Sequence, residues 1–171
     1  NYWEFFMASK ALGGGALLDE SHWIDLMYWF LGEPKQLFAR IDKISDLKID
    51  SDDNVDLLVI YKDGLHVNIH LDLYGRPHEK YISFIGEQGT IYWTADPNRV
   101  AVGKEMIQKW ETYDYGCERN DMFLGVAQEF LRVLEGAPVE TCSIQDGVRV
   151  LSFIEAARKS HSEGRLIDLP T

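Results

Sequence analysis

The sequence has few cysteines, no long apolar run and a shortage of positive charge. Cys117 and Cys142 are its only cysteines, and they lie far apart without the spacing of metal ligands. We therefore predict free thiols, as in a cytoplasmic protein. No apolar stretch approaches the ~18 residues that a membrane-spanning helix needs, and no signal-peptide pattern begins at Asn1. These absences argue against a membrane protein and against a cysteine-based metal centre.

The charge balance argues against nucleic acids and anionic membranes as partners. The chain has 17 Lys and Arg residues against 28 Asp and Glu residues, a net charge of −11, and no basic stripe interrupts it. Such a surface would repel the phosphate groups of nucleic acids and of anionic membranes. With 171 residues, 46% of them hydrophobic, the chain is long enough to form one domain with a substantial core.

Alternating strand-like segments fill the middle of the chain, and two helical segments follow them. Strands are expected at 35–44, 55–61, 65–74, 79–85 and 90–94, with edge strands at 98–102 and 106–113. Helices are expected at 121–134 and 143–163, the second capped by Ser143 and stopped by Gly164. We predict an α+β fold with a largely antiparallel or mixed, open-faced sheet of about five to six strands. Both helices are expected to cover one face of that sheet.

Neither of two sequence features that suggest a metal site meets the requirements of one. His66 and His70 share the polar face of the expected strand 65–74. They are roughly 13 Å apart at ~3.3 Å per residue, too far to bind one ion together. The acidic segment 46–54 lacks the central glycine and the spacing of an EF-hand, so we expect a solvated loop and no calcium.

The most informative segment runs from Gly13 to Gly32. Three glycines precede a helical pattern, Gly32 is its expected stop, and the uncharged run 26–31 is typical of a buried helix. On one continuous helix His22 would lie about 60° from Asp19 and about 60° from Asp25, so all three would share one flank. Because an unpaired buried charge costs several kcal/mol, these groups either pair with one another or face a cleft.

The sequence lacks the motif of a dinucleotide-binding fold. No strand is followed by G-x-G-x-x-G and a helix. The three glycines at 13–15 have no hydrophobic strand before them, so we do not expect them to cradle a phosphate.

The segment from Phe6 to Asp25, FMASKALGGGALLDESHWID, resembles the segment YSASKKLGGGVLLDLSHEIDY of a known family. That family comprises glucose–fructose oxidoreductase, inositol dehydrogenase and MocA (Gfo/Idh/MocA), and the matching segment lies in its C-terminal domain. Residues 143–165 are similar to the family's terminal helix, and the turn at 86–90 is similar to its GE-x-G-T turn.

The resemblance implies a particular domain organisation. Family members join an N-terminal Rossmann domain, which binds NAD or NADP, to a C-terminal α+β substrate domain, and they are about twice as long as this chain. Residues 1–171 would then be a single C-terminal substrate-binding and oligomerisation domain that lacks its Rossmann domain. Such a chain would bind no cofactor alone and would be inactive alone. It would pair with further copies through the open face of its sheet.

The resemblance also assigns roles to the acids and the histidine. His22 would correspond to the family's catalytic histidine, a general acid/base at the sugar hydroxyl, and Asp25 to the acid of its H-x-x-D pattern. Many members have Asp or Asn four residues before the histidine. Here Leu18 occupies that position and Asp19 lies three residues before.

Three further residues are candidates for substrate contacts. Arg76 could reach an anionic substrate group, although an arginine in a loop is usually solvated. Trp110 could stack on a sugar or pack in the core, and Tyr74 ends a polar sheet face that suits a carbohydrate or another subunit.

Two functions follow from these observations. The first is the substrate-binding part of an NAD(P)-dependent oxidoreductase that acts on the hydroxyl of a sugar, sugar acid or nucleotide sugar. The second is a non-catalytic dimerisation or ligand-sensing module of the same fold. The H-x-x-D pair favours the first, because a sensor has no need of a protonatable pair there.

Overall fold

The computed structural model describes residues 1–104 and 109–170. The chain divides into two compact units. The first comprises Asn1–Tyr74 together with Cys142–Thr171, and the second comprises Gly75–Thr141. The histidine and the acids of the candidate site all lie in the first unit.

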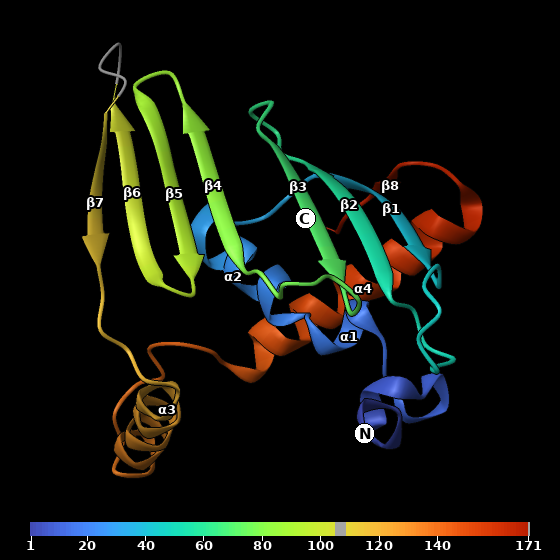
Figure 1. The fold of residues 1–171 in the computed structure, drawn as a ribbon, viewed down its shortest axis with the longest axis horizontal. Helices are drawn as coiled ribbons and strands as arrows, with labels where there is room; N and C mark the ends of the chain where they lie inside the picture. Colours follow the sequence, from blue (N-terminus) through green and yellow to red (C-terminus); the bar gives the residue numbers. More distant parts are fainter. Residues whose placement is uncertain (105–108, 171) are drawn as a thin grey trace. The chain divides into compact units, whose positions relative to one another are not determined.

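The first unit contains a four-stranded antiparallel sheet in the order β3-β2-β1-β8 (Figure 1). Its strands are β1 (Gln36–Asp42), β2 (Asn54–Ile60), β3 (His66–Asp72) and the short β8 (Ile167–Asp168). The turn between β2 and β3 contains Gly64 at φ +88°, as the sequence predicted from its Lys-Asp-Gly pattern. The apolar residues that alternate along these strands face the core.

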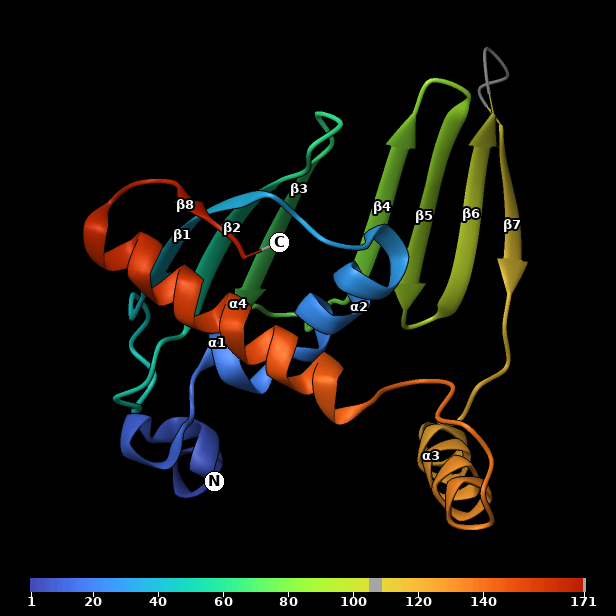
Figure 2. The same cartoon turned by 180° about the vertical axis from the view of Figure 1, so that it is seen from behind.

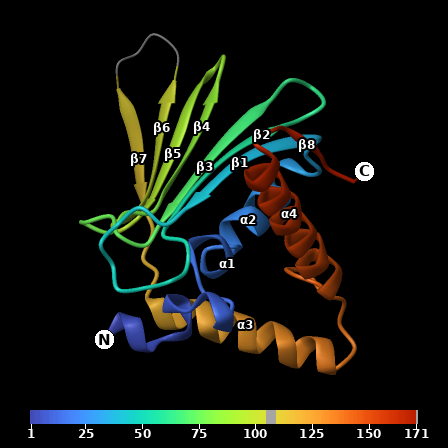
Figure 3. The ribbon, with the colours of Figure 1, turned by 90° about the vertical axis from the view of Figure 1, so that its right-hand side faces the viewer.

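Three helices lie on the same face of this sheet (Figures 2 and 3). They are α1 (Ala16–Asp19), α2 (His22–Leu31) and α4 (Ile144–Glu163). Ile24 of α2, Leu37 of β1 and Phe153 of α4 are almost completely buried in one hydrophobic cluster. Burial of apolar area of this kind is the main stabilising contribution to the unit.

Both predicted ends of α4 are confirmed. The Ser143 hydroxyl accepts the Asp146 backbone N–H at 3.3 Å, and the Asp146 carboxylate accepts the Ser143 N–H at 2.8 Å. This reciprocal capping box satisfies N–H groups that the first helical turn leaves unpaired. Gly164 ends the helix in the left-handed conformation at φ +64°.

Side chains from α4 bind the backbone of β1 along the edge that faces away from β2, beyond the two residues that pair with β8. The Ser160 hydroxyl accepts the Ala39 N–H at 3.0 Å and donates to the Arg165 carbonyl at 2.7 Å. Nδ1 of His161 accepts the Ile41 N–H at 3.1 Å. These contacts fix the long helix to the sheet, because buried backbone N–H groups need a partner.

The chain begins with three short 3₁₀ turns, Tyr2–Glu4, Phe6–Ala8 and Lys10–Leu12. They lie beside the loop that joins β1 to β2. The Ser51 hydroxyl donates to the Met7 carbonyl at 2.7 Å, and the Lys10 N–H donates to the Asp50 carboxylate at 2.7 Å. The loop therefore holds the segment that leads into α1.

The second unit contains a four-stranded antiparallel sheet in the order β4-β5-β6-β7 and one helix. The strands are β4 (Tyr81–Gly86), β5 (Gly89–Ala95), β6 (Asn98–Lys104) and β7 (Trp110–Asp114). The helix is α3 (Arg119–Leu134), capped by Glu118 and Asp121. Of the edge strand expected at 106–113, residues 106–108 lie outside the described part of the chain.

The α+β class is confirmed, and two details differ from prediction. Within residues 1–104 and 109–170, eight strands form two sheets where one sheet of five to six strands was expected. The chain between β3 and β4 contains Pro77, which has no N–H for a strand ladder. The prediction that α3 covers a sheet is wrong, because none of its residues is buried. Its large apolar side chains are exposed: Met122, Phe123, Leu124, Val126, Phe130, Leu131 and Leu134.

The contact between α4 and β1 gives a stability prediction. Ser160→Ala should lower the free energy of unfolding by about 1–3 kcal/mol, because it leaves the buried Ala39 N–H without an acceptor. Urea denaturation measures this change. Ser162→Ala is the matched control, since that exposed hydroxyl donates only to the Lys159 carbonyl of its own helix. Equal effects of the two substitutions would contradict the assignment.

Candidate active site

His22 lies at the start of α2, immediately after a break in the expected helix. The sequence predicted one continuous helix through Asp19, His22 and Asp25, and this prediction is wrong, because α1 ends at Asp19 and α2 begins at His22. Between them, Glu20 and Ser21 form a turn in which the Ser21 N–H donates to the carbonyl three residues earlier at 3.3 Å. Such a tighter bond changes the direction in which the following side chains point.

The acid beside His22 is Glu20. Nε2 of His22 lies 3.4 Å from Oε2 of Glu20, and the indole N–H of Trp23 donates to the same oxygen at 3.0 Å. Within the described residues, no ion pair or hydrogen bond joins His22 to Asp19 or Asp25. On a continuous helix Glu20 and His22 would lie about 200° apart, so helical spacing could not identify this pair.

One face of α2 is exposed, which corrects the prediction of a buried helix. Met27 and Tyr28 are buried, but Trp29 is 70% exposed, and the side chain of His22 is 56% exposed. Trp29 follows His22 by seven residues, so the two lie within about 20° of one another around the helix. Trp29 was not predicted as a site residue, although its seven-residue spacing from His22 is evident in the sequence.

The opposite end of α2 is held against α4. Nε of Arg149 lies 2.9 Å from Oε1 of Glu33, the residue just after Gly32. The same guanidinium lies 5.5 Å from the centre of the Tyr28 ring. Burial and the nearby Glu33 charge raise the pKa of the Tyr28 hydroxyl, so it stays protonated. These contacts fix the helix that carries His22 at its far end.

The glycine loop before α1 does not fit a phosphate group. The Leu17 N–H donates to the Asp52 carboxylate at 2.9 Å, and the Ala16 N–H donates to the Asp52 carbonyl at 2.9 Å. A Cβ on Gly15 would collide with that carboxylate. The N–H groups that an anion would need are therefore bound already, and a negative charge occupies the position of the anion. Any nicotinamide cofactor must bind outside this loop.

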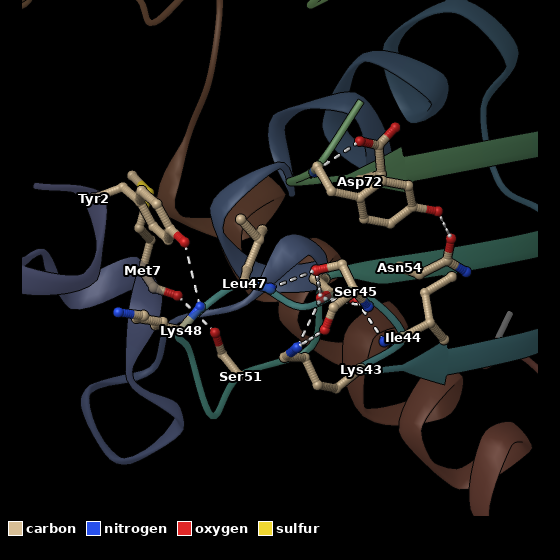
Figure 4. A network of polar contacts seen from close by, with 12 residues as sticks. Tyr2, Met7, Lys43, Ile44, Ser45, Leu47, Lys48, Ser51, Asn54 and Asp72 are labelled. Carbon is tan, nitrogen blue, oxygen red and sulfur yellow. Dashed lines mark hydrogen bonds and ion pairs between the residues drawn. The ribbon is translucent and has the colours of Figure 1, made fainter. Parts of the chain in front are cut away.

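The acidic loop that contains Asp52 is not a solvated loop, and that prediction is wrong for residues 51–53. Ser51 and Asp53 are completely buried. Oδ1 of Asp53 accepts the Ile44 N–H at 2.8 Å, and its other oxygen accepts the Ser45 hydroxyl and N–H groups. Figure 4 labels the donors Ile44 and Ser45 in this network. Backbone N–H groups replace water as partners of this carboxylate, which composition alone does not reveal.

The pKa of Asp53 is set by opposing effects. Burial would raise it, but the hydrogen bonds from Ser45 and Ile44 and the ammonium of Lys43, 3.4 Å away, lower it below the ordinary value of 3.8. Asp53 is therefore ionised in the folded chain at neutral pH.

Tyr74 takes part in a polar network on β2 and β3, on the side of the sheet away from the core. Its hydroxyl donates to Oδ1 of Asn54 at 2.6 Å, and burial and nearby Asp72 raise its pKa. His70 lies between two carboxylates, 2.7 Å from Asp56 and 3.4 Å from Asp72. No group of His, Cys, Asp and Glu side chains in the described part of the chain is arranged to hold a metal ion.

Arg76 and Trp110 belong to the second unit. Arg76 is exposed and donates to the neighbouring Gly75 carbonyl. Trp110 is 54% exposed, and its ring covers Gly103, where a Cβ would come within 3.2 Å of the ring. Of the two alternatives left open for Trp110, burial in a core is thus excluded within the described residues. His22, Asp19, Glu20, Trp23 and Asp25 belong to the first unit.

Comparison with known families shows to which family this chain belongs. A model of the GFO/IDH/MocA C-terminal domain matches residues 2–92, just over half of the chain. The chain belongs to this family. The match includes the glycine loop, α2 with His22, and the whole of β1 to β3.

The GFO/IDH/MocA fold is also seen in several solved structures at low sequence identity. Levoglucosan dehydrogenase in complex with NADH and levoglucosan has a TM-score of 0.84 at 20% identity, over 98% of this chain and 54% of that one. WlbA dehydrogenase from Bordetella pertussis, in complex with NADH and UDP-GlcNAcA, has a TM-score of 0.69 at 23% identity, over 92% and 47%. GenD2 from gentamicin A biosynthesis, in complex with NAD, has a TM-score of 0.76 at 24% identity, over 97% and 51%. This chain spans about half the length of each.

Three further findings complete the description of this GFO/IDH/MocA chain. A comparison with curated proteins gives no match. Among the described residues, no helix is both long and apolar enough to cross a bilayer. Cys117 and Cys142 are exposed and form no disulfide within the described residues, as the sequence predicted.

The lowered pKa of Asp53 gives a pH-dependent prediction. The unfolded chain binds a proton at Asp53 more readily than the folded chain does. The stabilisation by its carboxylate is therefore complete above pH 3.8 and is lost as pH falls through the lower folded pKa. Asp53→Asn should lower the free energy of unfolding by about 2 kcal/mol or more at pH 7, and by less below pH 3.8.

Urea denaturation at pH 7 and near pH 3 measures this difference. Asp46→Asn, at an exposed acid of the same loop, is the control and should change stability little at either pH. An effect of Asp53→Asn that does not depend on pH would show that the negative charge of Asp53 does not stabilise the folded chain.

Proposed function

We propose that this chain is the substrate-binding domain of an NAD- or NADP-dependent oxidoreductase that acts on a hydroxyl of a sugar, sugar acid or nucleotide sugar. Its membership of the GFO/IDH/MocA family supports the proposal. So does its fold, shared with dehydrogenases whose structures contain NADH together with levoglucosan or UDP-GlcNAcA.

In this proposal His22 transfers the proton of the substrate hydroxyl. The single observation that carries this role is an exposed imidazole whose neighbouring carboxylate, Glu20, is fixed by the indole of Trp23. An imidazole titrates near neutral pH and can therefore accept and return a proton at the working pH. A fixed carboxylate beside it stabilises the imidazolium that forms when the hydroxyl proton is taken.

We assign supporting roles to the other acids of the site. Asp25 lies in the first turn of α2, three residues after His22, and could bind a substrate hydroxyl there. Asp19 is the last residue of α1, and we propose that it contributes to the same face.

The proposed substrate contacts differ in how they are held. The Tyr74 hydroxyl is already bound to Asn54, so a sugar would meet an oriented group. Arg76 and the exposed ring of Trp110 are proposed to bind an anionic group and a sugar face, respectively.

The remaining parts of the enzyme lie outside this chain in our proposal. A nicotinamide cofactor, NAD or NADP, would supply the hydride chemistry when bound by a separate Rossmann domain; the glycine loop of this chain does not fit its phosphates. We further propose a cytoplasmic homo-oligomer that associates through the open sheet face.

A non-catalytic interaction module is the second candidate. The exposed apolar side chains of α3, among them Phe123 and Phe130, favour it, because contiguous apolar surface commonly marks an interaction site. This candidate requires no particular residue at position 22.

Substitution of His22 distinguishes the two candidates. In a protein that joins this chain to its nicotinamide-binding domain, His22→Ala should lower kcat for sugar oxidation by roughly 100-fold, because the hydroxyl proton loses its acceptor. Reduction of the nicotinamide, followed by absorbance, measures kcat. The control is His78→Ala, an exposed histidine between β3 and β4, which should leave kcat unchanged. If both variants turned over at the wild-type rate, His22 would have no part in proton transfer.

A further inference from the structure

The carboxylate of Asp52 binds the start of the short helix that precedes the His22 site. Oδ2 of Asp52 accepts the Leu17 N–H at 2.9 Å across 35 residues of sequence, and the Asp52 backbone carbonyl accepts the Ala16 N–H at 2.9 Å. The first N–H groups of a helix have no partner within the helix, so an acceptor from elsewhere fixes where the helix starts. Asp52 supplies two such acceptors to α1.

Gly15 makes this contact possible. Its φ is +121°, and a Cβ on it would overlap the Asp52 carboxylate. Only glycine adopts this conformation readily and also leaves room for the carboxylate. The glycine loop therefore accommodates an acid of the protein itself.

The residues around Asp52 hold it firmly. On one side Ser51 is buried and donates to the Met7 carbonyl at 2.7 Å. On the other side Asp53 is buried; its N–H donates to the Asp42 carbonyl at 3.0 Å, and its carbonyl accepts the Leu73 N–H at 3.1 Å. The loop is thus tied to the ends of β1 and β3, so the Asp52 carboxylate is presented from a fixed backbone.

Backbone hydrogen bonds connect α1 with Trp23, the residue that follows His22. The Asp19 N–H donates to the Gly15 carbonyl at 2.9 Å, and the Glu20 N–H donates to the Ala16 carbonyl at 3.1 Å. The Trp23 N–H then donates to the Glu20 carbonyl at 3.1 Å. A displacement of the first turn of α1 would therefore move Glu20 relative to His22 and Trp23.

We propose that Asp52 is a positioning residue for the proton-transfer site: its carboxylate fixes the start of α1 and so places Glu20 against His22 and Trp23. Among the contacts of the described residues, none joins Asp52 to the side chains of Glu20, His22 or Trp23. The effect of Asp52 on turnover rests on the proposed function of His22. Its effect on the position of Glu20 does not.

The indole N–H of Trp23 reports the position of Glu20 directly, because it donates to Oε2 of that residue. In the chain of residues 1–171, Asp52→Ala should move the Trp23 indole N–H proton resonance upfield, as its hydrogen bond weakens, and should shift the His22 ring resonances. Trp23→Phe assigns the indole signal among the five tryptophans.

Three variants separate positioning from general loss of stability. Ser160→Ala destabilises the same unit at the contact between α4 and β1, away from this loop, and should leave both sets of resonances in place. Asp52→Asn keeps an oxygen that can accept the Leu17 N–H and should restore most of the wild-type shifts. If Asp52→Ala does not fold, Asp52→Glu moves the carboxylate by one methylene group and should cause a smaller upfield shift.

Wild-type Trp23 and His22 resonances in folded Asp52→Ala would overturn the proposal, as would equal shifts in Ser160→Ala. In the protein joined to its nicotinamide-binding domain, Asp52→Ala should also lower kcat at least about tenfold, and Asp52→Asn should recover most of it. If the resonances move while His22→Ala keeps full activity, the geometric link holds and the proposed function fails.

Discussion

The hydrogen bond from the Leu17 backbone to the Asp52 carboxylate joins the loop between two core strands to the segment that carries the candidate active site. This contact requires a glycine at position 15 and a loop held at both ends. Because α1 has only four residues, it has little stability of its own and depends on such external partners. In this account, the loop between β1 and β2 determines where His22 lies.

Much of the fold could be predicted from local patterns. The alternation of 65–74, the glycine at 64 and the pair Ser143 and Asp146 each define a strand, a turn or a cap through residues that are close in sequence. His22 was proposed as a site residue in the same way, from the resemblance of its segment to a family segment. Local patterns of this kind predict structure well because residues that are close in sequence determine them.

The arrangement around His22 could not be predicted, because non-local contacts decide it. Helical spacing placed Asp19 and Asp25 beside the histidine, whereas a turn at Glu20 and Ser21 brings Glu20 there. The charge of the 46–54 segment indicated a solvated loop, yet Asp53 is buried among backbone N–H groups. The apolar spacing of α3 indicated a covered helix, and its side chains are exposed. In each case residue type is clear from sequence and the partner is not.

The central claim is that an acid on the β1–β2 loop fixes the segment leading to His22. Amide hydrogen exchange at Leu17 in the unmodified chain tests it most directly, because that N–H has its acceptor on Asp52. The account predicts exchange at Leu17 as slow as that of the buried Ile24 in α2. Exchange at the rate of an unstructured peptide, while Ile24 stays protected, would contradict it.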